Sequence, residues 1–433
     1  MTTYDAPSTL GHPVDPLNPA VTAAALPRHS RLPRPFTAGE HAARVRAVQA
    51  RMAERSLAAL VVSDPANLYY LTGYNAWSFY VPQCLVVPAD GKPHLFGRPM
   101  DMQGAHYTAH LDPDLDADRV HGYPEDLVHR QDVHPYEWMT ARAREVGVLP
   151  DEPGASVAAE TASHFFSPRG YRALVGGLMH TKVVDAHELV NWVRLVKSPA
   201  EQDMLRAAGR IADRVMATAI AAMAPGRRQC DVVAEILAAQ ATGAGGDDDR
   251  FGGDYPAIVP MLPTGERAGT PHLTWSDEVF VTGEATALEL AGAYQRYHAP
   301  LARTVSLGSP DPRLAQCADI VTEGMTAALE AMRPGAPARA AHAAFTQVIS
   351  RYGMSKESRV GYSIGIGYPP DWGERTVSLR AGEETVLAPG MAFHVILGMW
   401  LADWGYELSE SVLVTDSGVE RLTHQPQELT VIT

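Results

Sequence analysis

The sequence predicts two domains, a smaller α/β domain followed by a larger α+β domain. The 433 residues exceed the usual size of one hydrophobic core. Helical and strand patterns alternate up to about residue 184, which is typical of an α/β domain. Beyond that point long helical patterns are grouped around strands, as in an α+β layer architecture. A helix-capping sequence at Ser198 marks the transition between the two patterns.

The N-terminal part begins with a proline-rich segment. Residues 1–35 contain seven prolines and few large apolar side chains, so we expect a poorly ordered tail or a clasp over a partner subunit. The first domain is expected to span residues 36–190. It should contain a helix over 37–53, a buried strand within 57–74 that ends at a turn, and a hairpin over 83–98.

The second domain is expected to span residues 191–433. Ser198 can cap a helix with Pro199 at its first position and Glu201 at its third, which is a capping box. Helical patterns cover residues 200–223, 229–240, 312–332 and 338–352, and strand patterns cover 278–281, 286–293, 392–399 and 411–415.

The charge balance excludes some classes of partner. The formal net charge is −14, and no run rich in lysine and arginine occurs. Nucleic acids and anionic membranes both require a basic face, so we expect neither as a partner, and a small-molecule or peptide substrate is favoured. Cys84, Cys230 and Cys317 lack the spacing of a disulfide framework or a thiolate zinc site. The sequence shows no secretory leader and no membrane-spanning run, so we expect a cytoplasmic protein.

Several segments carry a specific resemblance. They read RLVKSPAEQDMLRAA from residue 194, ALELAGAYQRYHAPLARTV from 287, GYSIGIGYPPDWGE from 361, PGMAFHVILG from 389 and ELSESVLVT from 407. Together they are similar to the creatinase/aminopeptidase P/methionine aminopeptidase family. The resemblance covers the chain after the tail and implies a pita-bread α+β catalytic domain preceded by a smaller α/β domain.

The metallopeptidases of this family hold two divalent metals with five side chains. The resemblance places those ligand positions on Glu289, Pro300, Tyr362, Ile396 and Glu410. Proline and isoleucine side chains have no donor atom, and two carboxylates fall short of the charge and coordination number that a dinuclear site needs. We therefore expect no metal and no other cofactor.

The combined motifs resemble most closely the ectoine hydrolases, which open a cyclic amidine. The resemblance implies catalytic roles for three residues. His272 would transfer protons, Glu289 would be the nucleophile or the anchor for the cation, and Glu410 would orient the substrate or the attacking water. A creatinase-like or Xaa-Pro peptidase-like hydrolase, and a catalytically inactive binding scaffold of the same fold, are the alternatives.

Four further residues are candidate substrate contacts. Trp77 could stack on a flat cation or belong to a hydrophobic core, and Tyr362 could donate a hydrogen bond or fill the space of the missing histidine. Asp371 and Glu374 are expected at the rim of the site, with a solvated turn as the alternative. In creatinase-like dimers the N-terminal domain borders the other subunit's pocket, so we expect a homodimer that shares its active sites in this way.

Overall fold

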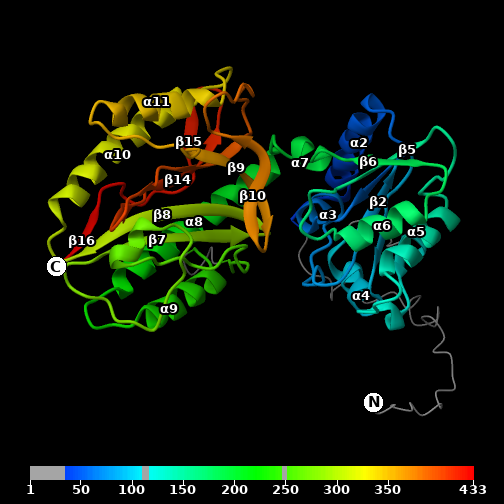
Figure 1. Cartoon of the computed structure of the whole chain (residues 1–433), viewed down its shortest axis with the longest axis horizontal. Coiled ribbons are helices and arrows are strands. Elements are labelled where there is room, and N and C mark those ends of the chain that lie inside the picture. The colour runs from blue at the N-terminus through cyan, green and yellow to red at the C-terminus, as the bar shows by residue number, and fades with distance from the viewer. Residues whose placement is uncertain (1–34, 110–116, 246–250) are drawn as a thin grey trace, which may run out of the picture. The chain divides into compact units, whose positions relative to one another are not determined.

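The computed structural model describes residues 35–109, 117–245 and 251–433 (Figure 1). The chain divides into two compact units, one ending at His187 and one running from Glu188 to Thr433. Apart from residue 35, the proline-rich tail expected at residues 1–35 lies outside the described residues.

The first unit is built on a six-stranded sheet. The strands lie in the order β4-β3-β2-β1-β5-β6, with β2 antiparallel to both β1 and β3 and the remaining pairs parallel. The strands are β1 (Ala59–Val62), β2 (Cys84–Pro88), β3 (His94–Gly97), β4 (Val120–Gly122), β5 (Ser156–Ala159) and β6 (Lys182–Asp185). The helices are α2 (Ala38–Glu54), α3 (Pro65–Thr72), α4 (Pro99–Thr108), α5 (Pro135–Glu145) and α6 (Pro168–Gly176), with short 3-10 turns at Ala117–Arg119 and Glu125–Leu127.

Local sequence explains most of the first unit. The helix expected over 37–53 is confirmed as α2, which starts where the Thr37 hydroxyl accepts the Glu40 amide at 3.1 Å. The hairpin expected over 83–98 is confirmed as β2 and β3. Helix α3 was not expected from the sequence. All eight of its residues are buried, so it lacks the amphipathic period by which a helix is recognised.

The second unit contains the remaining elements. Its helices are α7 (Leu189–Val193), α8 (Pro199–Ala222), α9 (Gln229–Thr242), α10 (Pro312–Ala331) and α11 (Arg339–Ser350), with a 3-10 turn at Gly265–Gly269. Its strands are β7 (Ala285–Tyr294), β8 (Tyr297–Leu307), β9 (Gly361–Tyr368), β10 (Asp371–Ser378), β11 (Ala392–Ile396), β12 (Met399–Trp400), β13 (Gly405–Tyr406), β14 (Ser409–Val414), β15 (Val419–Arg421) and β16 (Thr430–Ile432).

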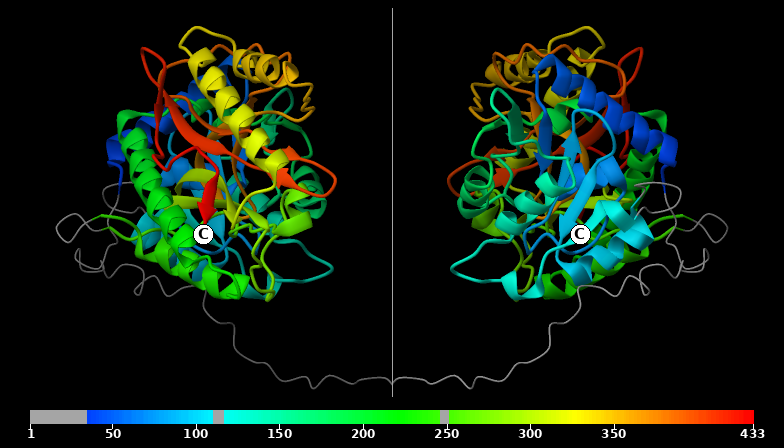
Figure 2. Two further views of the ribbon diagram at one scale, coloured as in Figure 1. Left: turned by 90° about the vertical axis from the view of Figure 1, so that its left-hand side faces the viewer. Right: turned by 90° about the vertical axis from the view of Figure 1, so that its right-hand side faces the viewer.

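The sheet of the second unit lies between two pairs of helices. Its strands run in the order β15-β14-β11-β9-β8-β16, with β10 added at β9 and β7 at β8. The pair α8 and α9 covers one side and the pair α10 and α11 the other, and the left-hand view of Figure 2 shows the strands between them. Two apolar clusters fill the space, one centred on α8 and β7 and one on α10, α11 and β11.

Most sequence expectations for this unit are confirmed. The four expected helices appear as α8, α9, α10 and α11. The capping box is present, because the Ser198 hydroxyl accepts the Glu201 amide at 3.3 Å and the Glu201 carboxylate accepts the Ser198 amide at 2.9 Å. The strand expected over 278–281 is wrong, since this segment makes a single bridge between Arg228 and Val279. None of the helices described here combines the length and apolarity needed to cross a bilayer.

Candidate active site

Glu289 lies at the centre of β7 with its carboxyl in the interior of the second unit. Strand β8 pairs with one edge of β7 along its length, and on the other edge the Glu289 backbone exchanges hydrogen bonds of 2.9 and 3.0 Å with Met261. The side chain is 6% exposed. Burial raises the pKa of Glu289 well above its usual range, and the negative charge of Glu407 raises it further. The surroundings therefore favour the protonated form of Glu289.

Glu407 provides a second buried carboxyl beside Glu289. It lies between β13 and β14, where the Thr304 hydroxyl accepts its amide at 2.8 Å and donates to its carbonyl at 3.0 Å. Burial raises the pKa of Glu407 to about 7, although the positive charge of Lys356 acts in the opposite direction. The two carboxyls interact, so their protons are released in two coupled steps and both pKa values lie above the usual range of a glutamate.

A chain of hydrogen bonds next to this pair links five strands, β10, β9, β11, β14 and β8. The Tyr362 hydroxyl accepts the Trp372 indole N–H at 2.8 Å and lies 3.0 Å from His394 Nδ1, and His394 Nε2 lies 2.7 Å from Ser409 Oγ. Ser409 Oγ accepts the Ala302 amide at 2.7 Å. Burial lowers the pKa of His394 to about 3, so its imidazole is neutral.

The proton on this neutral imidazole can sit on either nitrogen. With the proton on Nε2, Tyr362 donates to Nδ1 of His394; with the proton on Nδ1, Tyr362 accepts from the imidazole and its own O–H is free to donate elsewhere. In the second arrangement Tyr362 can donate a hydrogen bond to a substrate, which is the role expected from the sequence. The burial and the charge of Glu289 both keep the Tyr362 phenol neutral by raising its pKa.

The side chains at the family's ligand positions do not fit a pair of metals. Pro300 has no side-chain donor atom and its carbonyl accepts the Ser411 hydroxyl at 2.7 Å, while Ile396 is apolar. The Tyr362 oxygen is already engaged with Trp372. Within residues 35–109, 117–245 and 251–433, three or more His, Cys, Asp or Glu side chains nowhere gather in a metal-binding arrangement.

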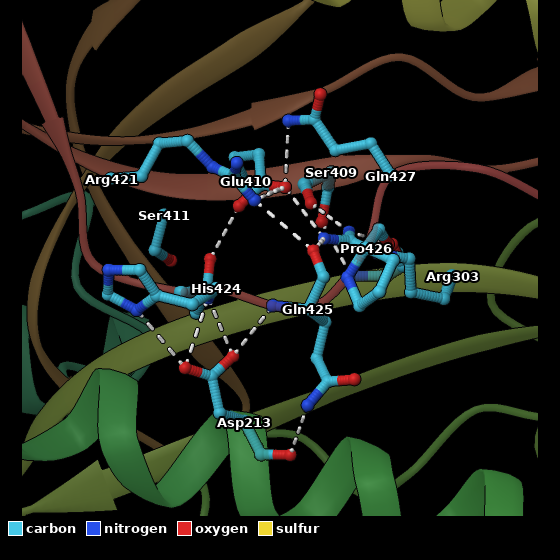
Figure 3. Close-up of polar contacts among 12 residues, drawn as sticks. Asp213, Arg303, Ser409, Glu410, Ser411, Arg421, His424, Gln425, Pro426 and Gln427 are labelled. Atoms are coloured by element: carbon cyan, nitrogen blue, oxygen red, sulfur yellow. Dashed lines mark hydrogen bonds and ion pairs between the residues drawn. The ribbon is translucent and has the colours of Figure 1, made fainter.

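Glu410 is the centre of an ion-pair network (Figure 3). Its carboxylate accepts from Arg303 at 2.6 Å, Arg421 at 2.9 Å, Thr423 at 2.7 Å and Gln427 at 3.0 Å. Successive side chains alternate across a strand, so Glu410 points away from the face on which Ser409 meets His394. Four donors already occupy the carboxylate, which favours a supporting role over the substrate contact expected from the sequence.

Arg303 connects the hydrogen-bond network of Glu410 to backbone carbonyls of neighbouring segments. Its guanidinium is fully buried and also donates to the carbonyls of Ala302, Ser409, Gln425 and Pro426. Asp213 on α8 accepts the amides of His424 and Gln425 at 2.8 and 3.2 Å, which holds the segment after β15 against the helix (Figure 3). The Glu410–Arg303 pair thus ties β14, β8 and the C-terminal segment together.

The two residues expected at the rim lie on β10, with different surroundings. Glu374 is 1% exposed and bonds Lys197 at 2.7 Å, with Arg194 at 3.6 Å. The expected rim position is therefore wrong for Glu374, because the sequence does not reveal that the loop between α7 and α8 supplies two buried cations, Arg194 and Lys197. Asp371 is half-buried and accepts the Gly373 amide at 2.8 Å.

The last two candidates, His272 and Trp77, have exposed side chains. His272 is exposed in a turn where its backbone adopts a left-handed conformation, with φ 67°. Trp77 belongs to the first unit, is 58% exposed and lies 4.9 Å from the Phe79 ring. The roles expected for both residues stay predictions.

Two segments of the chain match known protein families. Residues 203–416 match the Metallopeptidase family M24, and residues 44–196 match the Creatinase/Prolidase N-terminal domain. The chain is 42% identical to the ectoine hydrolase of Halomonas elongata over 401 residues, which cover 92% of this chain and 98% of that protein. It is 40% identical to an uncharacterized hydrolase/peptidase of Sinorhizobium fredii, with the same coverage.

The chain belongs to the M24 family, with a creatinase-type N-terminal domain. Among solved structures, dipeptidase PepE of Mycobacterium ulcerans superposes with a TM-score of 0.73 at 25% identity, over 92% of this chain and 100% of that one. These matches confirm the expected fold class, a pita-bread domain preceded by an α/β domain, and they make the chain a hydrolase.

Several residues of the candidate site were not expected from the sequence. They are Lys356, Trp372, His394, Glu407 and Ser409. The stretch ELSES contained one signal for Glu407 and Ser409. Side chains alternate between the two faces of a strand, so Glu407 and Ser409 share one face and Glu410 belongs to the other. Choosing between the two faces requires knowing which residues of β8 and β11 lie opposite them.

Proposed function

We propose that this M24 member is a metal-independent hydrolase that opens the cyclic amidine ring of ectoine, or of its hydroxylated form, to N-acetyl-diaminobutyrate. One observation carries the proposal: a buried carboxyl pair, Glu289 and Glu407, occupies the centre of a site whose metal-ligand positions hold Pro300 and Ile396. Such a pair suits a cationic substrate, because an amidinium ion supplies both positive charge and N–H donors. The 42% identity to an ectoine hydrolase supports the choice of substrate.

The chemistry follows from the amidinium group. Its central carbon is electrophilic, and either Glu289 or a water adds to it with loss of the C=N π bond. One ring nitrogen then takes up a proton and leaves as an amine, which opens the ring. If Glu289 is the nucleophile, departure of the amine leaves an O-acyl imidate on Glu289, and water hydrolyses it to the N-acetyl product and the carboxylate. The resemblance assigns proton transfer to His272, which is exposed in this structure and would have to approach the substrate.

Proton NMR of ectoine incubated with the purified protein tests this proposal. Parallel samples with and without EDTA should show the same rate of ring opening and the same acetylated product. Turnover that EDTA abolishes would retain the substrate but contradict the metal-independent chemistry. Intact ectoine in both samples would contradict the substrate, and cleavage of an Xaa-Pro dipeptide instead would favour the peptidase alternative.

The carboxyl pair predicts a pH dependence. A raised pKa means that the pair gains protons as the pH falls, and a protonated pair loses its attraction for a cation. We therefore expect kcat/KM for ectoine to decrease below pH 7, by about tenfold per pH unit for the loss of one essential ionisation, since Glu407 titrates at about 7. Ectoine keeps both its charges across this range. A kcat/KM that is constant between pH 5 and pH 8 would contradict the prediction.

A further inference from the structure

Glu407 occupies a position that the protein holds firmly. Its amide and carbonyl both bond the Thr304 hydroxyl, at 2.8 and 3.0 Å, so strand β8 fixes the backbone on either side of the side chain. The residue is 4% exposed. The two bonds fix the Glu407 backbone, and the low exposure places its carboxyl in the interior of the unit.

The contacts of Glu407 differ from those of Glu410, three residues further along. Four donors bond the Glu410 carboxylate. By contrast, Oε1 of Glu407 is buried and has no hydrogen-bond partner within the part of the chain that the structure describes. A buried polar atom without a partner costs free energy, and such atoms in native proteins call for an explanation such as a bound ligand.

The charges around Glu407 indicate what kind of ligand is missing. Glu289 approaches from β7, and its pKa rises partly because Glu407 is negative. Lys356 lies in the loop between α11 and β9. Its positive charge lowers the pKa of Glu407 and so acts against the effect of burial. The Lys356 ammonium is held by the Gly398 carbonyl at 2.5 Å and by the Trp400 ring at 4.1 Å. Lys356 therefore balances the charge of Glu407 while Glu289 is protonated, and one further cation would balance the charge that Glu289 carries once it is ionised.

We infer that Glu407 is the second acidic contact of the cationic substrate group, opposite Glu289, and that Lys356 is its counter-ion in the free protein. The inference rests on the proposed function and specifies its substrate class: a small cyclic cation with two N–H groups, one directed at each carboxylate. Substrate binding would bring an N–H donor to Oε1 of Glu407 and a positive charge between the carboxylates. The Lys356 ammonium would then compete with the substrate for Glu407.

Two ligands of the same shape but different charge test this inference. The cyclic guanidinium 2-amino-1,4,5,6-tetrahydropyrimidine and the neutral urea tetrahydro-2-pyrimidinone share one ring and both ring N–H groups. Calorimetry with the intact protein should show tighter binding of the cation. Glu407→Gln should weaken cation binding by about 10- to 100-fold, as expected for a charged hydrogen bond, and change urea binding far less.

The matched control is Glu420→Gln, which removes a carboxylate that pairs with Arg206 at 2.9 Å on half-exposed β15 and should change neither affinity. Lys356→Gln provides a second test if Glu407→Gln does not fold. Removing a competing ammonium should strengthen cation binding several-fold, opposite in sign to Glu407→Gln. Equal losses for both ligands in Glu407→Gln, or weaker cation binding in Lys356→Gln, would overturn the inference.

Failure of the inference and failure of the proposed function give different results. If the unmodified protein opens ectoine but Glu407→Gln keeps the same ratio of cation to urea affinity, the function stands and the role of Glu407 is rejected. If ectoine is not opened, the binding ratio still reports whether Glu407 selects a cyclic cation.

Discussion

Glu289→Gln is expected to lower kcat for ectoine on the order of 10³-fold or more, because the amide can neither attack the amidinium carbon nor neutralise its charge. The substitution keeps the size of the side chain in the middle of β7. Initial rates of ring opening by NMR at saturating ectoine, compared with those of the unmodified protein, measure the effect.

Stability distinguishes a chemical role of Glu289 from a structural one. Burial and the charge of Glu407 both work against an ionised Glu289, so Gln at this position should leave the melting temperature unchanged or raise it. An inactive variant that melts no lower than the original protein supports the catalytic role. Full activity in this variant would remove Glu289 from the mechanism.

Glu410→Ala is expected to destabilise the protein by about 3–5 kcal/mol, because it leaves the buried Arg303 guanidinium without its carboxylate. Arg421 is partly exposed at this site and would recover water contact, whereas Arg303 would not. Urea unfolding followed by circular dichroism measures the free energy of unfolding of the variant and of the original protein.

The Arg206–Glu420 pair is the matched control for Glu410. It joins β15 to α8 at 2.9 Å but is half-exposed, so Glu420→Ala should cost only about 0–1 kcal/mol. Activity per folded molecule separates the two roles considered for Glu410. A stable Glu410→Ala variant with a large loss of kcat would restore the role in orienting the substrate, whereas an unstable variant with near-normal kcat would establish the structural role.

The sequence by itself determined the elements whose signals are local. The capping box at Ser198 marks the start of α8, and the strand pattern around Glu289 marks β7, because capping and side-chain period depend only on near neighbours along the chain. The motif around Glu289 also pointed to one member of the buried carboxyl pair. Helix α3 escaped detection for the same reason, since burial on every side removes the periodic signal.

Only the tertiary structure distinguished the surroundings of two neighbouring glutamates. Glu407 and Glu410 are three residues apart, and their positions in the sequence are equally compatible with catalysis. Arg303, far away along the chain, donates to Glu410, and no described donor reaches Oε1 of Glu407. The interactions of a buried carboxyl depend on the strands that the fold places beside it, and that arrangement is set by long-range packing and not by the local sequence.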